Sequence, residues 1–212
     1  DASKKKDNEE TFNPENLEHK KYIDCAVFDA GIFGIAGEGR KLHTLKEEVY
    51  ENVIGTNQHG VFFGMQSFAQ NALEAQEKGI KQSFSAVIIA SIYAQSASVF
   101  SNVAYQASKA AALQIARQAG IELARNDIRV NSVSPTFLDT NMTRQFHGND
   151  YIRHAIEKHT PTGTWGKKES VASTVTYLLS PAAISITARD VAVDCGVLSE
   201  SLPNYVLNEE ME

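Results

Sequence analysis

Short apolar runs alternate along this chain with longer segments in which apolar residues recur at helical spacing. Four short runs predict strands, at residues 22–28, 85–90, 128–133 and 190–193. Three longer segments predict helices, at residues 44–78, 103–125 and 169–179. The first of these helices is expected to end at Lys78-Gly79, with the glycine as a C-cap. Because strands that alternate with helices of crossover length form parallel sheets, the pattern predicts an α/β fold.

The remaining segments are polar or mixed. Residues 1–21 predict a poorly packed polar arm, with a short helix after Pro14. Residues 139–160 contain aromatic and histidine side chains and are interpreted as a mobile helical lid, and residues 199–212 as an acidic tail. We find no internal repeat or linker, so one domain over 1–212 with a core at 22–198 is expected.

Composition narrows the class of protein. The chain has 212 residues, 42% hydrophobic and 22% charged, with a net charge of −6, which is typical of a soluble globular protein. No basic cluster indicates nucleic acid as a partner, and the apolar runs are too short to span a membrane. Cys25 and Cys195 do not form a disulfide framework and are interpreted as two buried thiols. A reducing, cytoplasmic location is therefore expected, since no signal peptide is present.

The strongest chemical signal is a tyrosine four residues before a lysine. Tyr105 and Lys109 fall on one face of the predicted helix at 103–125. A nearby cation favours phenolate and lowers the pKa of a phenol from about 10. The pair therefore predicts a group that passes a proton to or from a substrate oxygen.

The surroundings of this pair resemble the short-chain dehydrogenase/reductase family over residues 1–198. Ser91 ends a predicted strand fourteen residues before Tyr105, and Asn57 lies in an Asn-x-x-Gly pattern in the preceding long helix. The segments 128–135 and 191–196 are similar to the strand after the catalytic helix and to the closing strand of the family. Thr140 lies where the family contacts the nicotinamide amide.

The resemblance implies a Rossmann-like, doubly wound parallel sheet and a four-residue site. In it Tyr105 is the general acid/base, Lys109 lowers its pKa and holds the nicotinamide ribose, Ser91 bonds the substrate oxygen, and Asn57 holds a water that links Lys109 to solvent. The positions implied to face the cofactor NAD(P)(H) are Asp29, Ala30, Gly31, Lys109, Pro135, Thr136 and Thr140.

The sequence also departs from the family. Nothing before Tyr22 resembles the family's Gly-rich turn for the pyrophosphate, and Asp1-Ala2-Ser3 resembles the end of the family's third strand. We therefore expect an N-terminally truncated fold that lacks the first βαβαβ part, with 22–28 as an exposed edge strand. Asp29 and Thr136 replace an asparagine and a glycine of the family pattern, and Asp194-Cys195-Gly196 replaces Asp-Gly-Gly. A carboxylate at Asp29 and a side chain at Thr136 indicate altered dinucleotide binding.

Other kinds of site are not supported by the sequence. His154 and His159 are five residues apart, so they do not share a helix face, and no further ligands complete a metal site. A Gly-x-Ser-x-Gly nucleophile elbow is absent from the printed sequence. The aromatic helix face at 61–68 is interpreted as core or as a subunit interface, which favours a homo-oligomer, dimer or tetramer.

The sequence is compatible with three functions. The first is an NAD(P)(H)-dependent oxidoreductase acting on a carbonyl or hydroxyl group, with the Gly-rich segment in the parent chain. The second is a cofactor-free isomerase, dehydratase or cyclase on the same scaffold, and the third is a non-catalytic partner subunit that completes its sheet with another chain. Substrate choice is assigned to Ile92, Tyr93 and Gln95 and to residues 137–165, where aromatic side chains fit an apolar, aromatic or polyketide-like ligand as well as ordinary packing: Phe146, Tyr151 and Trp165.

Overall fold

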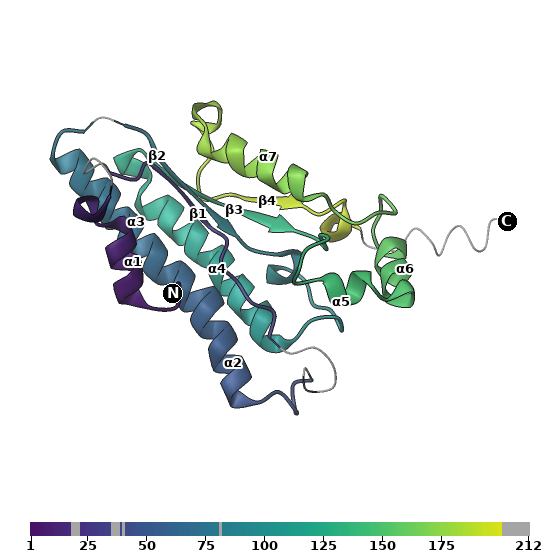
Figure 1. Cartoon of the computed structure of the whole chain (residues 1–212). Helices are drawn as coiled ribbons and strands as arrows, with labels where there is room; N and C mark the ends of the chain where they lie inside the picture. Colours follow the sequence, from purple (N-terminus) through teal and green to yellow (C-terminus); the bar gives the residue numbers. More distant parts are fainter. Residues whose placement is uncertain (18–21, 35–38, 40, 81, 201–212) are drawn as a thin grey trace.

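A computed structural model describes residues 1–17, 22–34, 39, 41–80 and 82–200 of the chain. Its centre is a parallel sheet in the order β1-β2-β3-β4, so neighbouring strands follow one another along the chain (Figure 1). The register pairs Cys25 with Ser85, Phe84 with Ile128, and Ser132 with Asp190. The strand ends differ from the predicted ones by three residues at most: β1 (Cys25–Phe28), β2 (Phe84–Ile89), β3 (Ile128–Pro135) and β4 (Asp190–Val193).

Helices cover both faces of this sheet. In Figure 1, α3 and α4 lie on one face and α7 on the other, α1 lies beside α3, and α5 and α6 follow the carboxyl end of β3. The bounds are α1 (Lys5–Phe12), α2 (Glu47–Ile54), α3 (Gly60–Glu77), α4 (Val103–Glu122), α5 (Arg144–His147), α6 (Asp150–Lys158) and α7 (Lys168–Leu179). The predicted helix at 44–78 is thus two helices, joined by a π-helical turn at Gly55–His59. The second helix ends at Glu77, with Lys78 as its C-cap and Gly79 next at φ +77°. In the described part of the chain, no helix combines the length and the apolar character that a bilayer span needs.

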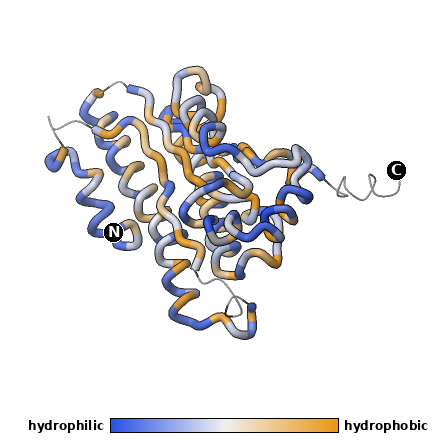
Figure 2. Tube along the Cα trace, turned by 45° about the vertical axis from the view of Figure 1, so that its right-hand side comes forward, coloured by the Kyte–Doolittle hydropathy of each residue, from blue (hydrophilic) through white to orange (hydrophobic). Residues whose placement is uncertain are grey.

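The main core lies between the sheet and the helices α3 and α4. The strands carry continuous apolar runs because a parallel sheet is buried on both faces. Figure 2 shows hydrophobic colour gathered on the central strands and hydrophilic colour along α1. Phe68, Phe84 and Ile128 are fully buried here. A second cluster lies between the sheet and α7 and contains Val87, Val133 and Leu178. Both clusters position the carboxyl ends of β2 and β3, where the candidate site begins.

A buried arginine ties α7 to the sheet. The Arg129 guanidinium, on β3, donates to the carbonyl oxygens of four residues at or just after the end of α7: Leu178, Leu179, Ser180 and Ala183. The carboxyl end of a helix leaves carbonyl groups without partners inside the helix. A cation there also interacts favourably with the negative end of the helix dipole. Arg129 therefore anchors the end of α7 on the buried face of the sheet.

The predicted polar arm is wrong in part. Residues 5–12 form the helix α1, and Phe12 is only 8% exposed, with its ring centroid 5.9 Å from that of Phe68. The Asn71 side chain donates to the Phe12 carbonyl and secures this contact. One apolar residue in a polar helix is too sparse a pattern to reveal such packing. The expected short helix after Pro14 is confirmed as a 3-10 helix at Pro14–Asn16, and residues 18–21 of the arm lie outside the described residues.

The two cysteines are not buried as predicted. Cys25 is exposed and Cys195 is half-buried. β1 is an edge strand of the described sheet, and Val27, on the same face as Cys25, is also exposed. An edge strand with one open face accepts apolar residues that a central strand would bury. The edge position of β1 itself confirms the prediction for this segment.

Two further predictions concern the lid at 139–160 and the acidic tail at 199–212. The predicted lid contains the helices α5 and α6, so its helical character is confirmed, while its mobility stays a prediction. Most of the predicted acidic tail, at 201–212, lies outside the described residues.

Candidate functional site

The candidate site is built at the first turn of α4. Asn102 caps this helix, because its side-chain oxygen accepts a hydrogen bond of 2.9 Å from the Tyr105 backbone N–H. Its side-chain nitrogen donates to the Phe33 carbonyl at 2.7 Å. The same residue therefore fixes the start of the helix and holds the loop after β1 against it.

Tyr105 and Ser91 meet in one small cavity. Tyr105 is buried, and its ring centroid lies 5.0 Å from that of Phe33. Ser91 follows β2 at its carboxyl end and hydrogen-bonds the Tyr105 phenol. Both line a cavity of about 60 Å³, together with Pro135 and Thr136 from the end of β3. Two hydroxyl groups thus face one small space, where a single substrate oxygen could bond to both.

Lys109 lies one helical turn beyond Tyr105 and is also buried. Its ammonium donates to the Ile89 carbonyl at 2.7 Å and lies 5.8 Å from the centroid of the Tyr105 ring. Burial lowers the pKa of Lys109 to about 8, and the negative charge of Asp29 raises it in part. A lysine with this pKa changes charge within the working range of most enzymes.

The pKa of Tyr105 departs from the prediction. Burial raises it to about 12, the hydrogen bond from Ser91 lowers it, and Tyr93 and the Asp29 charge raise it. The expectation that Lys109 lowers this pKa is therefore wrong for the structure described here. Loss of hydration of the phenolate outweighs the hydrogen bond from Ser91, and the ammonium of Lys109 is held at a main-chain carbonyl beside the ring.

Asn57 lies in the π-helical turn and is fully buried. Its amide closes onto Ile32, accepting from the backbone N–H at 2.8 Å and donating to the carbonyl at 2.9 Å. It also donates at 3.0 Å to the Ser108 hydroxyl, which in turn donates to the Tyr105 carbonyl at 2.8 Å. Asn57 therefore braces the loop after β1 against α4, and its predicted water-holding role stays a prediction.

Gly31 lies where Lys109 and Asn57 converge. A Cβ atom at Gly31 would lie 3.4 Å from the Lys109 ammonium nitrogen and 3.5 Å from the Asn57 side-chain oxygen. Absence of a side chain here keeps the approach to the ammonium open. Asp29 and Ala30, which precede it, are exposed at the end of β1.

The other predicted positions divide between cavity and surroundings. Thr140 does not line the cavity and instead hydrogen-bonds Thr143, which does. Gln95 donates at 2.9 Å to Asp190, which ties its loop to β4. Tyr151 is 85% exposed, so it does not contribute to an apolar binding surface in this structure. Trp165 packs against Phe137, with their ring centroids 5.6 Å apart.

Several residues of the site were not predicted from the sequence. Phe33 lines the cavity beside Tyr105, Asn102 caps α4, and Ser108 links Asn57 to the helix. Asn102 had a readable signal, since asparagine before an apolar helix start is a common N-cap. Phe33 had none, because its loop has no periodic pattern. Among the described residues, no group of three or more His, Cys, Asp and Glu side chains could hold a metal ion.

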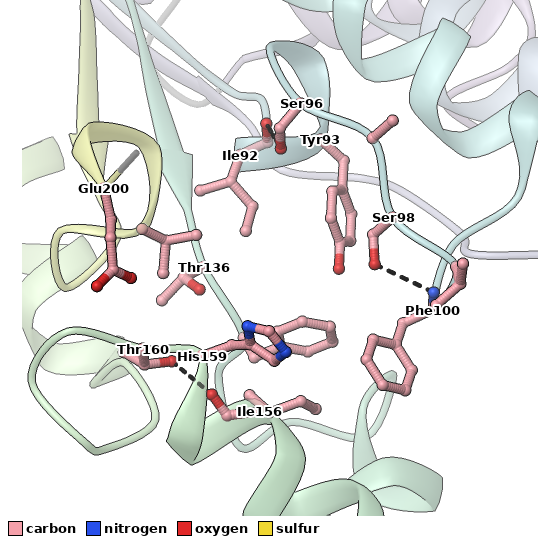
Figure 3. Close-up of a pocket in the computed structure, with 14 residues that line it drawn as sticks. Ile92, Tyr93, Ser96, Ser98, Phe100, Thr136, Ile156, His159, Thr160 and Glu200 are labelled. Atoms are coloured by element: carbon pink, nitrogen blue, oxygen red, sulfur yellow. Dashed lines mark hydrogen bonds between the residues drawn. The ribbon is translucent and has the colours of Figure 1, made fainter. Parts of the chain in front are cut away.

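A larger cavity of about 450 Å³ adjoins the first (Figure 3). The two share the lining residues Ile92, Tyr93, Thr136 and Phe137, so they meet between the loop after β2 and the end of β3. Figure 3 shows Tyr93, Ser98 and Phe100 on one side of this cavity and Glu200 across from them.

Known reductases and reductase homologs are similar in sequence to this chain. A family model described as enoyl-(acyl carrier protein) reductase matches residues 1–198. A 3-oxoacyl-[acyl-carrier-protein] reductase of Chlamydia pneumoniae is 30% identical over 181 residues, which are 85% of this chain and 68% of that protein. A tropinone reductase homolog of Arabidopsis thaliana is 40% identical over 92 residues, which are 43% of this chain and 34% of that protein.

Solved structures have the same arrangement. A 4-hydroxyisoleucine dehydrogenase mutant complexed with NADH and succinate superposes with a TM-score of 0.83 at 27% identity, covering 95% of this chain and 79% of that one. A gluconate 5-dehydrogenase from Burkholderia cenocepacia in complex with NADP and tartrate has a TM-score of 0.83 at 22% identity, covering 94% of this chain and 74% of that one, and supports the fold alone. The chain spans 34% and 53% of the length of two Arabidopsis relatives that it matches.

Proposed function

Because this chain belongs to the short-chain dehydrogenase/reductase family, we propose that it carries the catalytic residues of an NAD(P)(H)-dependent oxidoreductase acting on a carbonyl or hydroxyl group of a small molecule. One observation carries the proposal. The hydroxyls of Ser91 and Tyr105 line one cavity, and the Lys109 ammonium is buried one helical turn away. The relative named as a reductase supports the reaction class, and the 4-hydroxyisoleucine dehydrogenase complexed with NADH supports the cofactor.

The described residues fit the nicotinamide half of such a cofactor. Lys109 uses one of its three N–H groups in the bond to Ile89, which leaves donors for ribose hydroxyls. Gly31 keeps the approach to that ammonium open, and Pro135 and Thr136 line the cavity that holds Tyr105. When bound, the nicotinamide supplies or accepts a hydride. The Gly-rich turn for its pyrophosphate would have to come from residues beyond the printed sequence.

The chain's own residues would handle the substrate oxygen and its proton. In the reducing direction, Ser91 donates a hydrogen bond to the carbonyl oxygen and Tyr105 gives that oxygen its proton. In the oxidising direction, Tyr105 accepts the alcohol proton. To accept it, the phenol must first lose its own proton, which burial of the ring makes harder. We further propose that Asn57 holds the loop after β1 in the position that this geometry needs.

We also propose that the protein is a homo-oligomer. An apolar hollow of about 360 Å³ runs between α3 and α4 on the outer side of the molecule, lined by Met65, Leu73, Ile115 and Leu123. Phe62 borders this hollow and is 47% exposed. A self-complementary contact about a two-fold axis would cover such a surface.

Nucleotide titration and one substitution test the proposed reaction. The full-length protein that contains this sequence should bind NADH or NADPH and consume it when a ketone is added. Tyr105→Phe should bind the same nucleotide, with turnover lowered by about 10² to 10⁴-fold, because it keeps the ring and loses the proton donor. Tyr50→Phe, on the exposed side of α2, serves as the matched control and should behave as wild type.

The same experiment separates the alternatives. Turnover that depends on Tyr105 without any nucleotide would replace the proposal with cofactor-free acid/base catalysis. A protein that neither binds nucleotide nor converts substrate would indicate a non-catalytic subunit.

A further inference from the structure

The two joined cavities divide the space available to a substrate very unequally. The cavity with Ser91 and Tyr105 has a volume of about 60 Å³, which is room for about two water molecules. The adjoining cavity has a volume of about 450 Å³, within the usual range for small-molecule sites. A third cavity, of about 600 Å³, also borders the small one at Phe33 and Met142, but Gly31 lines it, on the side proposed for the cofactor. A substrate that places its oxygen between the two hydroxyls is therefore expected to lay the rest of its body in the 450 Å³ cavity.

Aromatic rings form one side of the larger cavity. Phe137 makes edge-on contacts with Tyr93 and Phe100, with ring centroids 5.9 and 6.4 Å apart. Trp165 packs behind Phe137 at 5.6 Å, and the Phe100 backbone N–H is held by the Ser98 hydroxyl at 3.1 Å. Rings fixed in this way bind flat apolar groups with little loss of side-chain freedom.

Much of the remaining lining is apolar: Ile92, Ala97, Val99, Ile156 and Val197. His159 and Glu200 also line the cavity, as Figure 3 shows, and both make interactions of their own. A carboxylate or phosphate on the substrate would lose much of its hydration against these apolar walls. A neutral substrate avoids this cost.

From these features we infer the substrate class: an uncharged ketone, or the corresponding secondary alcohol, whose body is a ring system lying against Tyr93, Phe100 and Phe137. The inference rests on the proposed function for the identity of the reacting group. The inferred shape and charge of the rest of the substrate depend only on the larger cavity. Anionic ketones and small or heavily hydroxylated ketones are expected to bind poorly.

Calorimetric titration of the full-length protein measures the affinity for each ketone without requiring turnover. α-Tetralone should bind about tenfold or more tightly than cyclohexanone, because its second ring adds buried apolar surface. Para-methylacetophenone should bind at least about tenfold more tightly than para-acetylbenzoate, which has nearly the same shape and carries a charge. NAD(P)H consumption is followed in parallel with the same ketones.

A matched pair of variants locates the binding. Phe100→Ala should weaken α-tetralone binding by roughly five- to tenfold, because it removes one wall of the cavity. Phe100 is the better choice than Phe137, which also packs against Phe146 and Trp165. Tyr177→Ala removes an exposed ring from α7, outside the cavity, and should leave binding unchanged.

The outcomes are distinct for the two proposals. Equal binding of α-tetralone and cyclohexanone, or of the neutral and anionic ketones, overturns the substrate class, as does an unchanged affinity in Phe100→Ala. Binding that follows the expected pattern without NAD(P)H consumption supports the substrate class and contradicts the oxidoreductase proposal. NAD(P)H consumption with ketones of another class does the reverse.

Discussion

The ammonium nitrogen of Lys109 lies 2.7 Å from the carbonyl oxygen of Ile89, the last residue of β2. This bond fixes a positive charge at the carboxyl end of the strand that leads to Ser91. It joins two segments that are twenty residues apart in the sequence, the central strand and the first turns of α4. The charge is buried, so the protein loses stability to place it there, and that loss must depend on pH.

The first prediction concerns this dependence. The pKa of Lys109 is lowered to about 8 in the folded chain, from 10.5 for an ordinary lysine. Between these values the unfolded chain binds more protons than the folded chain, so the free energy of unfolding should rise with pH. Lys109→Met removes this titration. The stability of wild type relative to Lys109→Met should therefore improve by up to about 3 kcal/mol between pH ~7 and pH ~10.

Urea denaturation of both proteins at several pH values measures this difference. Leu42→Met, at a position that is 77% exposed, changes no ionisable group and is the control; its stability relative to wild type should not depend on pH. A flat difference for Lys109→Met as well would mean that the ammonium is better solvated than its burial indicates.

The second prediction concerns the pH profile of turnover. Burial raises the pKa of Tyr105 to about 12, so the phenol stays protonated over the ordinary range. If Tyr105 accepts the proton in alcohol oxidation, the oxidation rate should keep rising with pH up to the limit of protein stability. Ketone reduction, which uses the protonated phenol, should not rise in this way. Steady-state rates in both directions give the profiles, and an oxidation rate that levels off below pH ~8 would contradict a phenol with this pKa.

The third prediction concerns the bracing by Asn57. Its amide makes hydrogen bonds with both backbone groups of Ile32 and with the Ser108 hydroxyl, all at a fully buried position. Asn57→Ala would remove these bonds from both Ile32 backbone groups, while Ser108 keeps its bond to the Tyr105 carbonyl, and should lower the free energy of unfolding by about 2–4 kcal/mol. The exposed Asn52→Ala on α2 should cost much less. Thermal and urea unfolding measure both, and similar losses for the two variants would show that Asn57 braces nothing.

The fourth prediction compares two glycines in helical segments. A Cβ at Gly120 would lie 2.6 Å from the Ala188 nitrogen and 2.7 Å from the Val130 oxygen, both main-chain atoms that cannot move aside. Gly120→Ala should therefore destabilise the fold by about 2–3 kcal/mol. At Gly55 a Cβ would meet nothing within 4 Å, so Gly55→Ala should be neutral or stabilise the chain by up to about 1 kcal/mol. Chemical denaturation should rank the variants in that order, and a reversed order would mean that α4 lies farther from β3 than described.

These cases show what the sequence could reveal. The strands were readable because a buried parallel strand is a short apolar run, and the spacing of Tyr105 and Lys109 was readable because a helix repeats every 3.6 residues. Asn57 and Ser91 could be assigned only through the family resemblance. Nothing local in their sequence marks one as buried in a π-helical turn and the other as a neighbour of Tyr105.

The predictions that were wrong concern features that depend on contacts between segments far apart in the sequence. The pKa of Tyr105 is set by how much of the fold surrounds the phenol, which a charge four residues away does not reveal. The burial of Phe12 depends on α1 lying against α3, and the exposure of Cys25 depends on the position of β1 in the sheet. Such features follow from the assembled structure and leave little trace in periodicity.

The fifth prediction tests the proposed homo-oligomer. Phe62 on α3 and Tyr177 on α7 are each 47% exposed, but Phe62 borders the apolar hollow between α3 and α4. A charge in a subunit interface is left without water, whereas a charge on an open surface is not. Phe62→Asp should therefore shift the protein towards monomer, with an association weakened by about 100-fold or more, while Tyr177→Asp should keep the wild-type mass. Light scattering coupled to gel filtration over a range of concentrations measures this, and a monomeric wild type, or an oligomer that withstands Phe62→Asp, would exclude this face as the contact.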